Sequence, residues 1–191
     1  MPPPEWRPCG ASQSATVPTA ERVGPRAIAD ADRRLQARAL TDELDLEPHP
    51  EGGWYREIYR SSDRVQTARG ARSAITVIYY LLEHNQVSRW HVVEADEIWQ
   101  FHEGAPLELL AYDAKARALE RHVLGSTSND HERVAVIRKG IWQAARSLEE
   151  FSLVGCCVGP GFEFDDFRFV ASLPEHQAHF DGVLAPFASL L

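Results

Sequence analysis

Ten short runs of β-forming residues fill most of this chain between residues 54 and 170. Each run is rich in Val, Ile, Leu, Tyr or Phe, and Gly, Pro, Asn and Asp separate one run from the next. Many short strands at such spacing favour a β-sandwich or barrel. The sequence therefore predicts an all-β domain. Its strands are expected at residues 54–60, 74–82, 88–92, 97–102, 107–112, 119–124, 132–137, 141–144, 151–158 and 167–170.

A helical pattern is found on either side of this β-rich part. Apolar residues recur near helical spacing over residues 30–44, with Asp30 or Asp32 as the N-cap. Residues 173–180 predict a short C-terminal helix, on which His176 and His179 share a solvated polar face. We therefore expect the β-rich part to carry a short helix at each end.

Composition narrows the class of protein. Residues 1–29 hold six of the twelve prolines and predict a disordered leader, which leaves 30–191 as a single domain. A formal net charge of -8 argues against a nucleic-acid partner, and no apolar stretch approaches the length of a membrane span. The three cysteines lack framework spacing, which indicates a reducing compartment. We expect a cytoplasmic protein.

The stretch 88–104 carries the strongest signal for a site. It holds one histidine, His91, followed closely by three carboxylates that include Glu97. Because side chains alternate along a strand, Glu97, Trp99 and Phe101 share one face. If that face is the interior, Gln143 joins it from a later strand. The sequence thus predicts a pocket with one imidazole, one carboxylate, one amide and aromatic walls, which suits a small organic ligand.

This stretch resembles the first motif of the cupin superfamily, in which a His-x-His pair precedes a glutamate and a glycine follows seven residues later. Glu97 and Gly104 keep the last spacing, and His91 lies one position from the usual second histidine. Arg89 lies where the first histidine is sought. The segment 138–143 is similar to the second motif, with Gln143 at the position of its histidine.

Five further segments resemble one branch of that superfamily, the small single-domain cupins long catalogued as a domain of unknown function. The resemblance implies a cupin double-stranded β-helix, which is an antiparallel jelly roll, paired as a homodimer. It implies much less about chemistry, because a fold does not determine a function. The five segments are 49–57, 73–82, 96–101, 106–110 and 153–162.

Three functions remain open for such a pocket. The first is an isomerase or epimerase, similar to the metal-free sugar epimerases of the superfamily, with His91 as general base and Glu97 or Asp96 orienting it. The proton donor would be a tyrosine, namely Tyr112, Tyr79 or Tyr80. The second is a metal-dependent oxygenase or lyase. The third is a small-molecule-binding module without catalysis.

The metal hypothesis requires one divalent ion, of unknown identity, held by His91, Glu97 and Gln143. A neutral amide is a poor ligand, and metal sites generally need at least three good donors. Gln143 in place of a histidine therefore favours the isomerase and the binding module over the metal enzyme. Without a metal, no cofactor is expected.

The ligand is expected to touch several residues besides His91 and Glu97. Arg89 offers a bidentate fork for a phosphate or carboxylate. The loop at residues 49–54 can close over the barrel mouth, although its two glycines are explained by turn geometry alone. The expected ligand-binding residues are Arg89, Trp99, Phe101, Gln143, Trp54 and Arg56.

Overall fold

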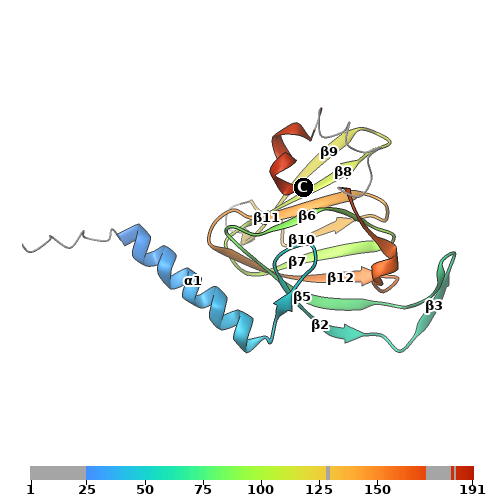
Figure 1. Ribbon diagram of the computed structural model, residues 1–191, viewed down its shortest axis with the longest axis horizontal. Coiled ribbons are helices and arrows are strands. Elements are labelled where there is room, and N and C mark those ends of the chain that lie inside the picture. Colours follow the sequence, from blue (N-terminus) through green and yellow to red (C-terminus); the bar gives the residue numbers. More distant parts are fainter. Residues whose placement is uncertain (1–24, 128–129, 171–181, 183) are drawn as a thin grey trace, which may run out of the picture.

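The computed structural model describes residues 25–127, 130–170, 182 and 184–191. Thirteen strands follow one long helix in these residues, and a 3-10 turn closes the chain (Figure 1). The elements are α1 (Pro25–Glu43), β1 (Glu47–Pro48), β2 (Trp54–Arg60), β3 (Arg64–Thr67), β4 (Gly70–Ser73), β5 (Thr76–Glu83), β6 (Val87–Val93), β7 (Asp96–Gly104), β8 (Leu107–Asp113), β9 (Ala118–Leu124), β10 (Val134–Ile137), β11 (Trp142–Ser147), β12 (Phe151–Gly159), η2 (Phe164–Asp166), β13 (Phe167–Phe169) and η5 (Ala185–Leu190).

Two antiparallel sheets face each other and form a jelly roll, as predicted. The first has the strand order β1-β2-β5-β12-β7-β10, and the second has the order β13-β6-β11-β8-β9. Strands far apart in the sequence are neighbours here, since β12 lies between β5 and β7. The main core lies between the sheets and is built on Tyr80, Trp99, Phe101, Leu107, Leu109 and Val154.

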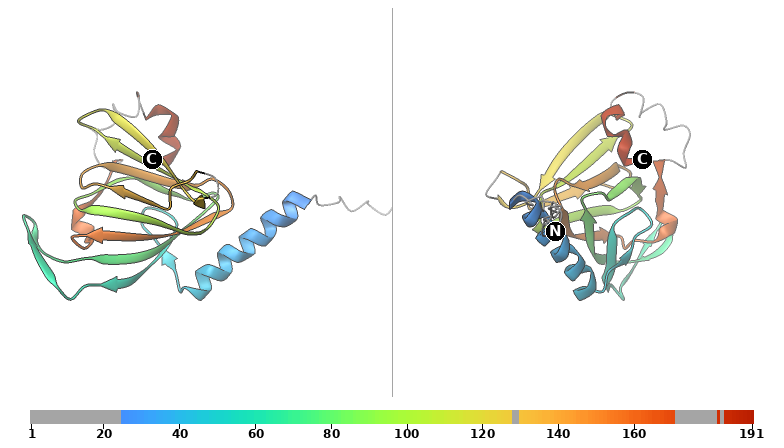
Figure 2. Two further views of the ribbon diagram at one scale, coloured as in Figure 1. Left: turned by 180° about the vertical axis from the view of Figure 1, so that it is seen from behind. Right: turned by 60° about the vertical axis from the view of Figure 1, so that its left-hand side comes forward.

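The ten predicted strands are all present, and their ends agree with the prediction to within three residues. Along β7 the alternation is as expected, with Glu97, Trp99 and Phe101 buried and His102 exposed. The hairpin of β3 and β4 has no counterpart in the prediction. It is polar, pairs Arg64 with Ser73, and extends beyond the body of the two sheets (Figure 2).

Helix α1 is longer than predicted. It begins at Pro25, so the N-cap prediction at Asp30 or Asp32 was wrong, and residues 25–29 belong to the helix rather than to a leader. Proline suits a first helical turn because its missing N–H has no partner there in any case. The rest of the predicted leader, residues 1–24, lies outside the described residues.

The helix leans on the outer face of the first sheet. Ala37 of the helix is buried and packs with Leu81 and Phe151. Arg33 and Arg34 pair with Glu149 and Glu150, which lie on the turn before β12. These contacts attach the helix to one end of the jelly roll (Figure 1). Within the described part of the chain, no helix has the length and apolar character to cross a membrane.

The second sheet is covered on both faces. Its outer face packs Trp90, Tyr112 and Trp142 against Leu184 and Leu190 near the C-terminus. Burial along β8 is consequently almost continuous. The predicted helix at 173–180 and its histidines His176 and His179 lie outside the described residues, whereas the short η5 turn follows them and supplies this cover.

Cys156 and Cys157 behave as the strand pattern predicts. Cys156 is buried and Cys157 is half-buried on the opposite face of β12, and both thiols are free. Burial raises the pKa of the Cys156 thiol well above its usual value. A thiol of this kind is a packing group rather than a nucleophile.

Candidate functional site

A pocket with a cavity volume of about 150 Å³ opens between the two sheets at one end of the jelly roll. Its polar lining comes from β1 and the loop after it and from strands β2, β6 and β7. Its apolar lining comes mainly from the segment 162–167 and from single residues of β2, β5, β6 and β12. Two imidazoles and two carboxylates in it are nearly inaccessible to solvent. They are His49, Glu51, His91 and Glu97.

At the inner end of the pocket a hydrogen-bonded chain links four of the predicted residues. The Trp99 indole nitrogen donates to Gln143 Oε1 at 3.1 Å. Gln143 Nε2 lies 2.5 Å from Glu97 Oε2 and 3.0 Å from His91 Nε2. An indole N–H only donates, so the amide oxygen must face Trp99 and the amide nitrogen must face the other two groups. Gln143 therefore donates to both His91 and Glu97.

This arrangement determines the tautomer of His91. Because Nε2 accepts from the Gln143 amide, the ring proton lies on Nδ1. Nδ1 donates to the backbone oxygen of Arg89 at 2.7 Å and is 3.2 Å from Glu51 Oε2. Burial lowers the pKa of His91, and the nearby Glu97 opposes that effect. His91 is thus a neutral imidazole, oriented by a carboxylate on one nitrogen and by an amide on the other.

Glu51 reaches the site through a tight loop. Gly52 and Gly53 have φ values of +113° and +72°, which favour glycine, and a Cβ on Gly52 would lie 2.1 Å from the Val87 carbonyl oxygen. The Arg89 guanidinium donates to the Pro50 oxygen at 2.5 Å and to the Glu51 oxygen at 3.3 Å. The loop is therefore held against β6 with the Glu51 side chain turned inward.

The buried acids and bases of the pocket have shifted pKa values. Burial raises the pKa of Glu51 and of Glu97, although His49 and His91 respectively oppose the shift. Burial also lowers the pKa of His49, which lies 3.6 Å from Glu51. Carboxylate and imidazole pKa values thus move towards each other, so that a proton can pass between the two kinds of group at low cost.

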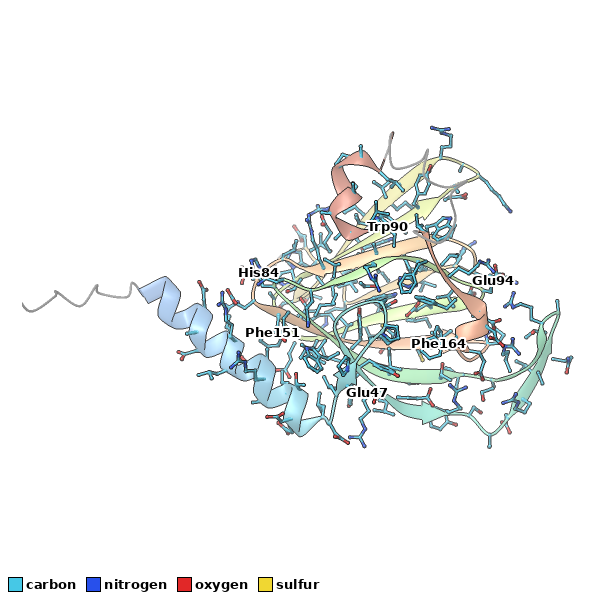
Figure 3. All side chains as sticks on the ribbon, viewed as in Figure 1. Glu47, His84, Trp90, Glu94, Phe151 and Phe164 are labelled. Carbon is cyan, nitrogen blue, oxygen red and sulfur yellow. The ribbon has the colours of Figure 1, made fainter. Side chains whose placement is uncertain are left out.

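Aromatic rings build the wall on one side of the pocket. The Phe167 ring stacks on His91, with ring centroids 5.0 Å apart, and Phe162 contacts Phe164 edge to face at 5.2 Å. Phe164 is the first residue of η2 and is 55% exposed (Figure 3). Tyr55 adds a ring from β2. The inner pocket is therefore polar, and further out an aromatic wall lies opposite charged residues such as Glu57 and Arg60.

A family model described as "Cupin superfamily (DUF985)" matches residues 38–170, which is more than half of the chain. The chain belongs to this cupin family. It is similar to a solved structure from Shewanella oneidensis at 35% identity and a TM-score of 0.65, over 74% of this chain and 92% of that one. A hypothetical protein from Leishmania major is similar at 29% identity and a TM-score of 0.66, over 76% and 96% of the two chains.

More distant cupins share the fold. Oxalate decarboxylase from Bacillus subtilis superposes with a TM-score of 0.52 at 15% identity, over 78% of this chain and 37% of that one. The structural similarity supports the double-stranded β-helix, but at so low an identity it carries no information about chemistry. A comparison with curated proteins finds no match.

Several residues predicted to touch ligand lie outside the pocket of this cupin. Tyr112 packs on the outer face of the second sheet, so its hydroxyl does not have the position that the predicted acid requires. Trp54 donates to Glu83 Oε1 on the side facing α1, and Arg56 donates to the Leu44 oxygen. Arg89 holds the loop at residues 50–51 rather than facing the cavity.

The two remaining aromatic predictions are supporting residues. Trp99 orients Gln143 beneath the pocket, and Phe101 belongs to the main core. Of the other candidate tyrosines, Tyr80 is buried and donates to the Gly52 oxygen at 2.7 Å, and its pKa lies well above the usual value because of burial. Tyr79 packs with the outer cluster beneath α1.

The sequence prediction missed His49 and Glu51. The loop that carries them was explained by the turn geometry of its glycines, and no site role was assigned to His49 or Glu51. A signal was available, since two consecutive glycines indicate a tight turn and an acidic residue lies directly before them. Parity along β2 also places Tyr55, rather than Trp54 or Arg56, on the cavity side.

The donor set of this cupin does not fit a tightly held divalent metal in the arrangement observed. The Nε2 lone pair of His91 accepts from Gln143, and the only oxygen of Gln143 accepts from Trp99. In the described residues, no three His, Cys, Asp or Glu side chains are grouped so that they can hold a metal ion. The amide nitrogen of Gln143 lies between the two groups that a metal would have to bridge.

Proposed function

We propose that this cupin binds a small polar metabolite in the jelly-roll pocket and interconverts its isomers by metal-free proton transfer, with His91 as the base. The observation that supports this most strongly is the contact between Glu51 and His91 Nδ1. A carboxylate at one nitrogen stabilises the imidazolium that forms when the other nitrogen accepts a proton.

The second nitrogen, Nε2, accepts from Gln143 in the free protein. A carbonyl or hydroxyl oxygen of the ligand that takes over this amide hydrogen bond leaves Nε2 able to accept a proton. Glu97 is then the candidate acid in place of the expected tyrosine, because it lines the pocket and burial raises its pKa towards that of the imidazole. An acid and a base with converging pKa values suit an isomerisation, in which one proton leaves and one returns.

The test is deuterium incorporation. Protein is incubated in D₂O with a panel of aldoses, ketoses and other small hydroxylated metabolites, and mass spectrometry detects the gain of one deuteron at carbon. We expect exchange with at least one compound, and a loss of about 10²-fold or more in its rate for His91→Ala. His102→Ala, on the exposed face of β7, is the matched control. Full exchange by His91→Ala would sink the proposal.

A binding module without catalysis is the second candidate. Both ring nitrogens of His91 already have hydrogen-bond partners, and such a saturated network can serve recognition alone. This alternative predicts saturable binding of a compound that never exchanges deuterium. The same incubation, followed by calorimetry on any compound that protects the protein against heat, separates the two functions.

A metal-dependent oxygenase or lyase is tested by elemental mass spectrometry on tag-free protein. Near one iron, zinc, manganese or nickel per chain in the wild type, lost in His91→Ala, would replace the proposed mechanism with a metal-dependent one. The arrangement around Gln143 predicts that the wild-type protein holds clearly less than one metal ion per chain.

We also propose that the protein is a homodimer. Edge strand β10 exposes Val134 and Val136, at 49% and 53%, and β2 exposes Ile58 and Tyr59. Apolar side chains on a sheet edge favour pairing with a second chain. Light scattering coupled to gel filtration measures the mass, and a monomer at micromolar concentration would refute this. The cytoplasmic location stays a prediction.

A further inference from the structure

The charge of the pocket indicates which ligand it accepts. Its lining contains five glutamates and one arginine, Arg60. Arg60 is already engaged by two of these carboxylates, since it lies 2.8 Å from Glu57 and 3.0 Å from Glu163. No lysine or arginine of the described residues forms an ion pair with the inner carboxylates of Glu51 and Glu97. The inner pocket therefore carries more negative than positive charge.

The inner carboxylates are also deeply buried. Glu51 and Glu97 are 6% and 8% exposed, and both line the cavity. A buried carboxylate needs a positive partner as well as hydrogen bonds to remain ionised at low cost. The groups that contact them directly include imidazoles, an amide and the Cys156 thiol, which supply hydrogen bonds without supplying charge. Arg89 acts on Glu51 only at longer range, because its guanidinium is bonded to the backbone oxygens of Pro50 and Glu51. A positive charge in direct contact with these carboxylates is what this part of the pocket lacks.

The aromatic wall supports the same class of ligand independently. Phe162, Phe164, Phe167 and Tyr55 line the outer part of the cavity, and the first three meet edge to face, with ring centroids 5.2 Å and 6.0 Å apart. Perpendicular rings turn π-faces in more than one direction, and a π-face attracts a cation. An anionic ligand would meet these faces and the glutamates with no free arginine to bind it, because Arg89 lies elsewhere.

We propose that the ligand of this pocket is a small organic cation with N–H donors, such as the protonated amine of an amino sugar. Its N–H groups donate to Glu51 and Glu97, and its carbon skeleton lies against the phenylalanine wall. This inference depends on the proposed use of the pocket as the ligand site, but it does not depend on catalysis.

The probes are two matched pairs that differ in charge at nearly constant shape, titrated calorimetrically into the full chain at pH 7. Glucosamine is compared with glucose, and methylguanidinium with methylurea. Hydrogen bonds between two charged groups are stronger than those of neutral groups, so each cation is expected to bind about tenfold or more tightly than its neutral partner. Glucose 6-phosphate is expected to bind more weakly than glucose.

Variants of the inner carboxylates test whether these residues cause the preference for a cation. Glu97→Gln keeps the shape and removes the charge, so the preference for the cation is expected to fall about tenfold, and Glu51→Gln provides a second variant should the first not fold. Glu103→Gln, on the exposed end of the same strand as Glu97, is the control and keeps the preference. Equal or tighter binding of the neutral or anionic partner, or no saturable binding of either cation, overturns the inference.

The outcomes for function and ligand class are separable. Cation-selective binding without deuterium exchange supports the inference and refutes the isomerase. Deuterium exchange into a neutral sugar, with no preference for glucosamine, supports the isomerase and refutes the inference.

Discussion

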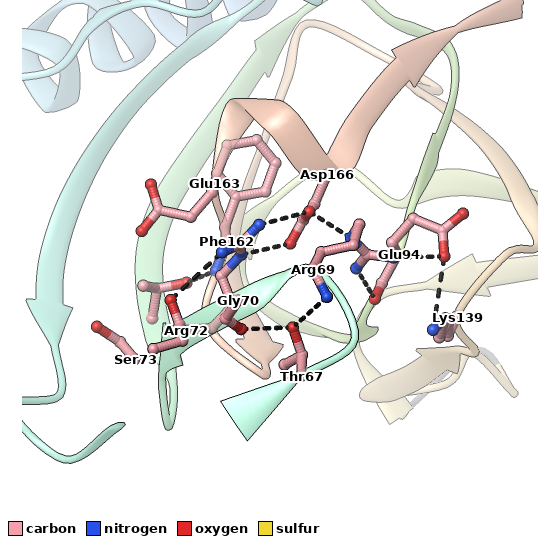
Figure 4. A network of polar contacts seen from close by, with 12 residues as sticks. Thr67, Arg69, Gly70, Arg72, Ser73, Glu94, Lys139, Phe162, Glu163 and Asp166 are labelled. Carbon is pink, nitrogen blue, oxygen red and sulfur yellow. Dashed lines mark hydrogen bonds and ion pairs between the residues drawn. The ribbon is translucent and has the colours of Figure 1, made fainter. Parts of the chain in front are cut away.

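Replacement of Asp166 by asparagine is expected to weaken the wall of the pocket. Asp166 follows Phe164 at the end of η2, and its carboxylate accepts from Arg69 Nε at 2.6 Å and from Arg72 Nε at 2.8 Å (Figure 4). Only 4% of the Asp166 side chain is exposed, against 11% for Arg72. The carboxylate thus joins the β3–β4 hairpin to the segment that carries the phenylalanines.

The magnitude follows from the Asp166 carboxyl group. Hydrogen bonds from Arg72 lower its pKa from 3.8 to about 2, with burial opposing and Arg69 adding to the effect. One pH unit corresponds to about 1.4 kcal/mol, so the ionised carboxylate stabilises the folded state by about 2 kcal/mol. Because the pKa is lower in the folded state, this stabilisation is complete well above pH 4 and is lost as the pH falls from 3.8 towards 2.

Urea unfolding at several pH values measures this directly. Asp166→Asn is expected to lower the free energy of unfolding by about 2 kcal/mol at pH 7, and the difference from wild type should shrink below pH 4. Asp165→Asn, an exposed neighbour, is the control and should change the free energy by less than about 0.5 kcal/mol. A similar loss in both variants, or a difference that is independent of pH, would refute the reasoning.

Three further predictions concern the site itself. Gln143→His replaces the amide that separates His91 from Glu97, so zinc or nickel bound per chain, measured by elemental analysis, should rise above the wild-type content; no gain would show that another feature prevents metal binding. Tyr112→Phe should leave ligand affinity and deuterium exchange unchanged, because the side chain packs outside the pocket, and a large loss of either would restore it as a candidate acid. Gly52→Ala should lower stability by more than about 1 kcal/mol in thermal unfolding, since the added Cβ would lie 2.1 Å from a backbone oxygen, and a neutral result would contradict the tight loop.

The strands were predictable because their signal is local. In β7 the buried and exposed residues alternate, and that alternation identified the face that carries Glu97 and Trp99. The hairpin of β3 and β4 escaped because it contributes no buried apolar face, and its place depends on ion pairs such as that between Arg72 and Asp166. Such pairs join residues almost a hundred positions apart, which the spacing of residues does not reveal.

The start of the helix was also missed for a local reason. Asp30 and Asp32 match the usual N-cap residues, but the helix begins five residues before the first of them, at Pro25. Proline is compatible with the first turn of a helix, so Pro25 was wrongly assigned to the proline-rich leader. The composition of a segment is therefore a weaker guide than the position of its individual residues.

Part of the site could likewise be predicted from the sequence, and part depends on the tertiary structure. His91 and Glu97 were found from their strand, their parity and their resemblance to a motif. Continuous burial along β8 hides which face holds the cavity, and this is why Tyr112 was misplaced. The approach of Glu51 to His91 arises from a loop folded back across β6, a contact between residues forty positions apart.

The sequence by itself thus determined the strands and two residues of the pocket, because alternation along a strand is a property of neighbouring residues. Its resemblance to a family then implied that these strands form a jelly roll. Only the tertiary structure decided the rest. Packing of the two sheets assigned one face to the pocket and another to the C-terminal cover, and the indole of Trp99, which can only donate, determined the direction of the Gln143 amide. The state of His91 follows from that direction, through contacts that exist only once three strands and a loop have come together.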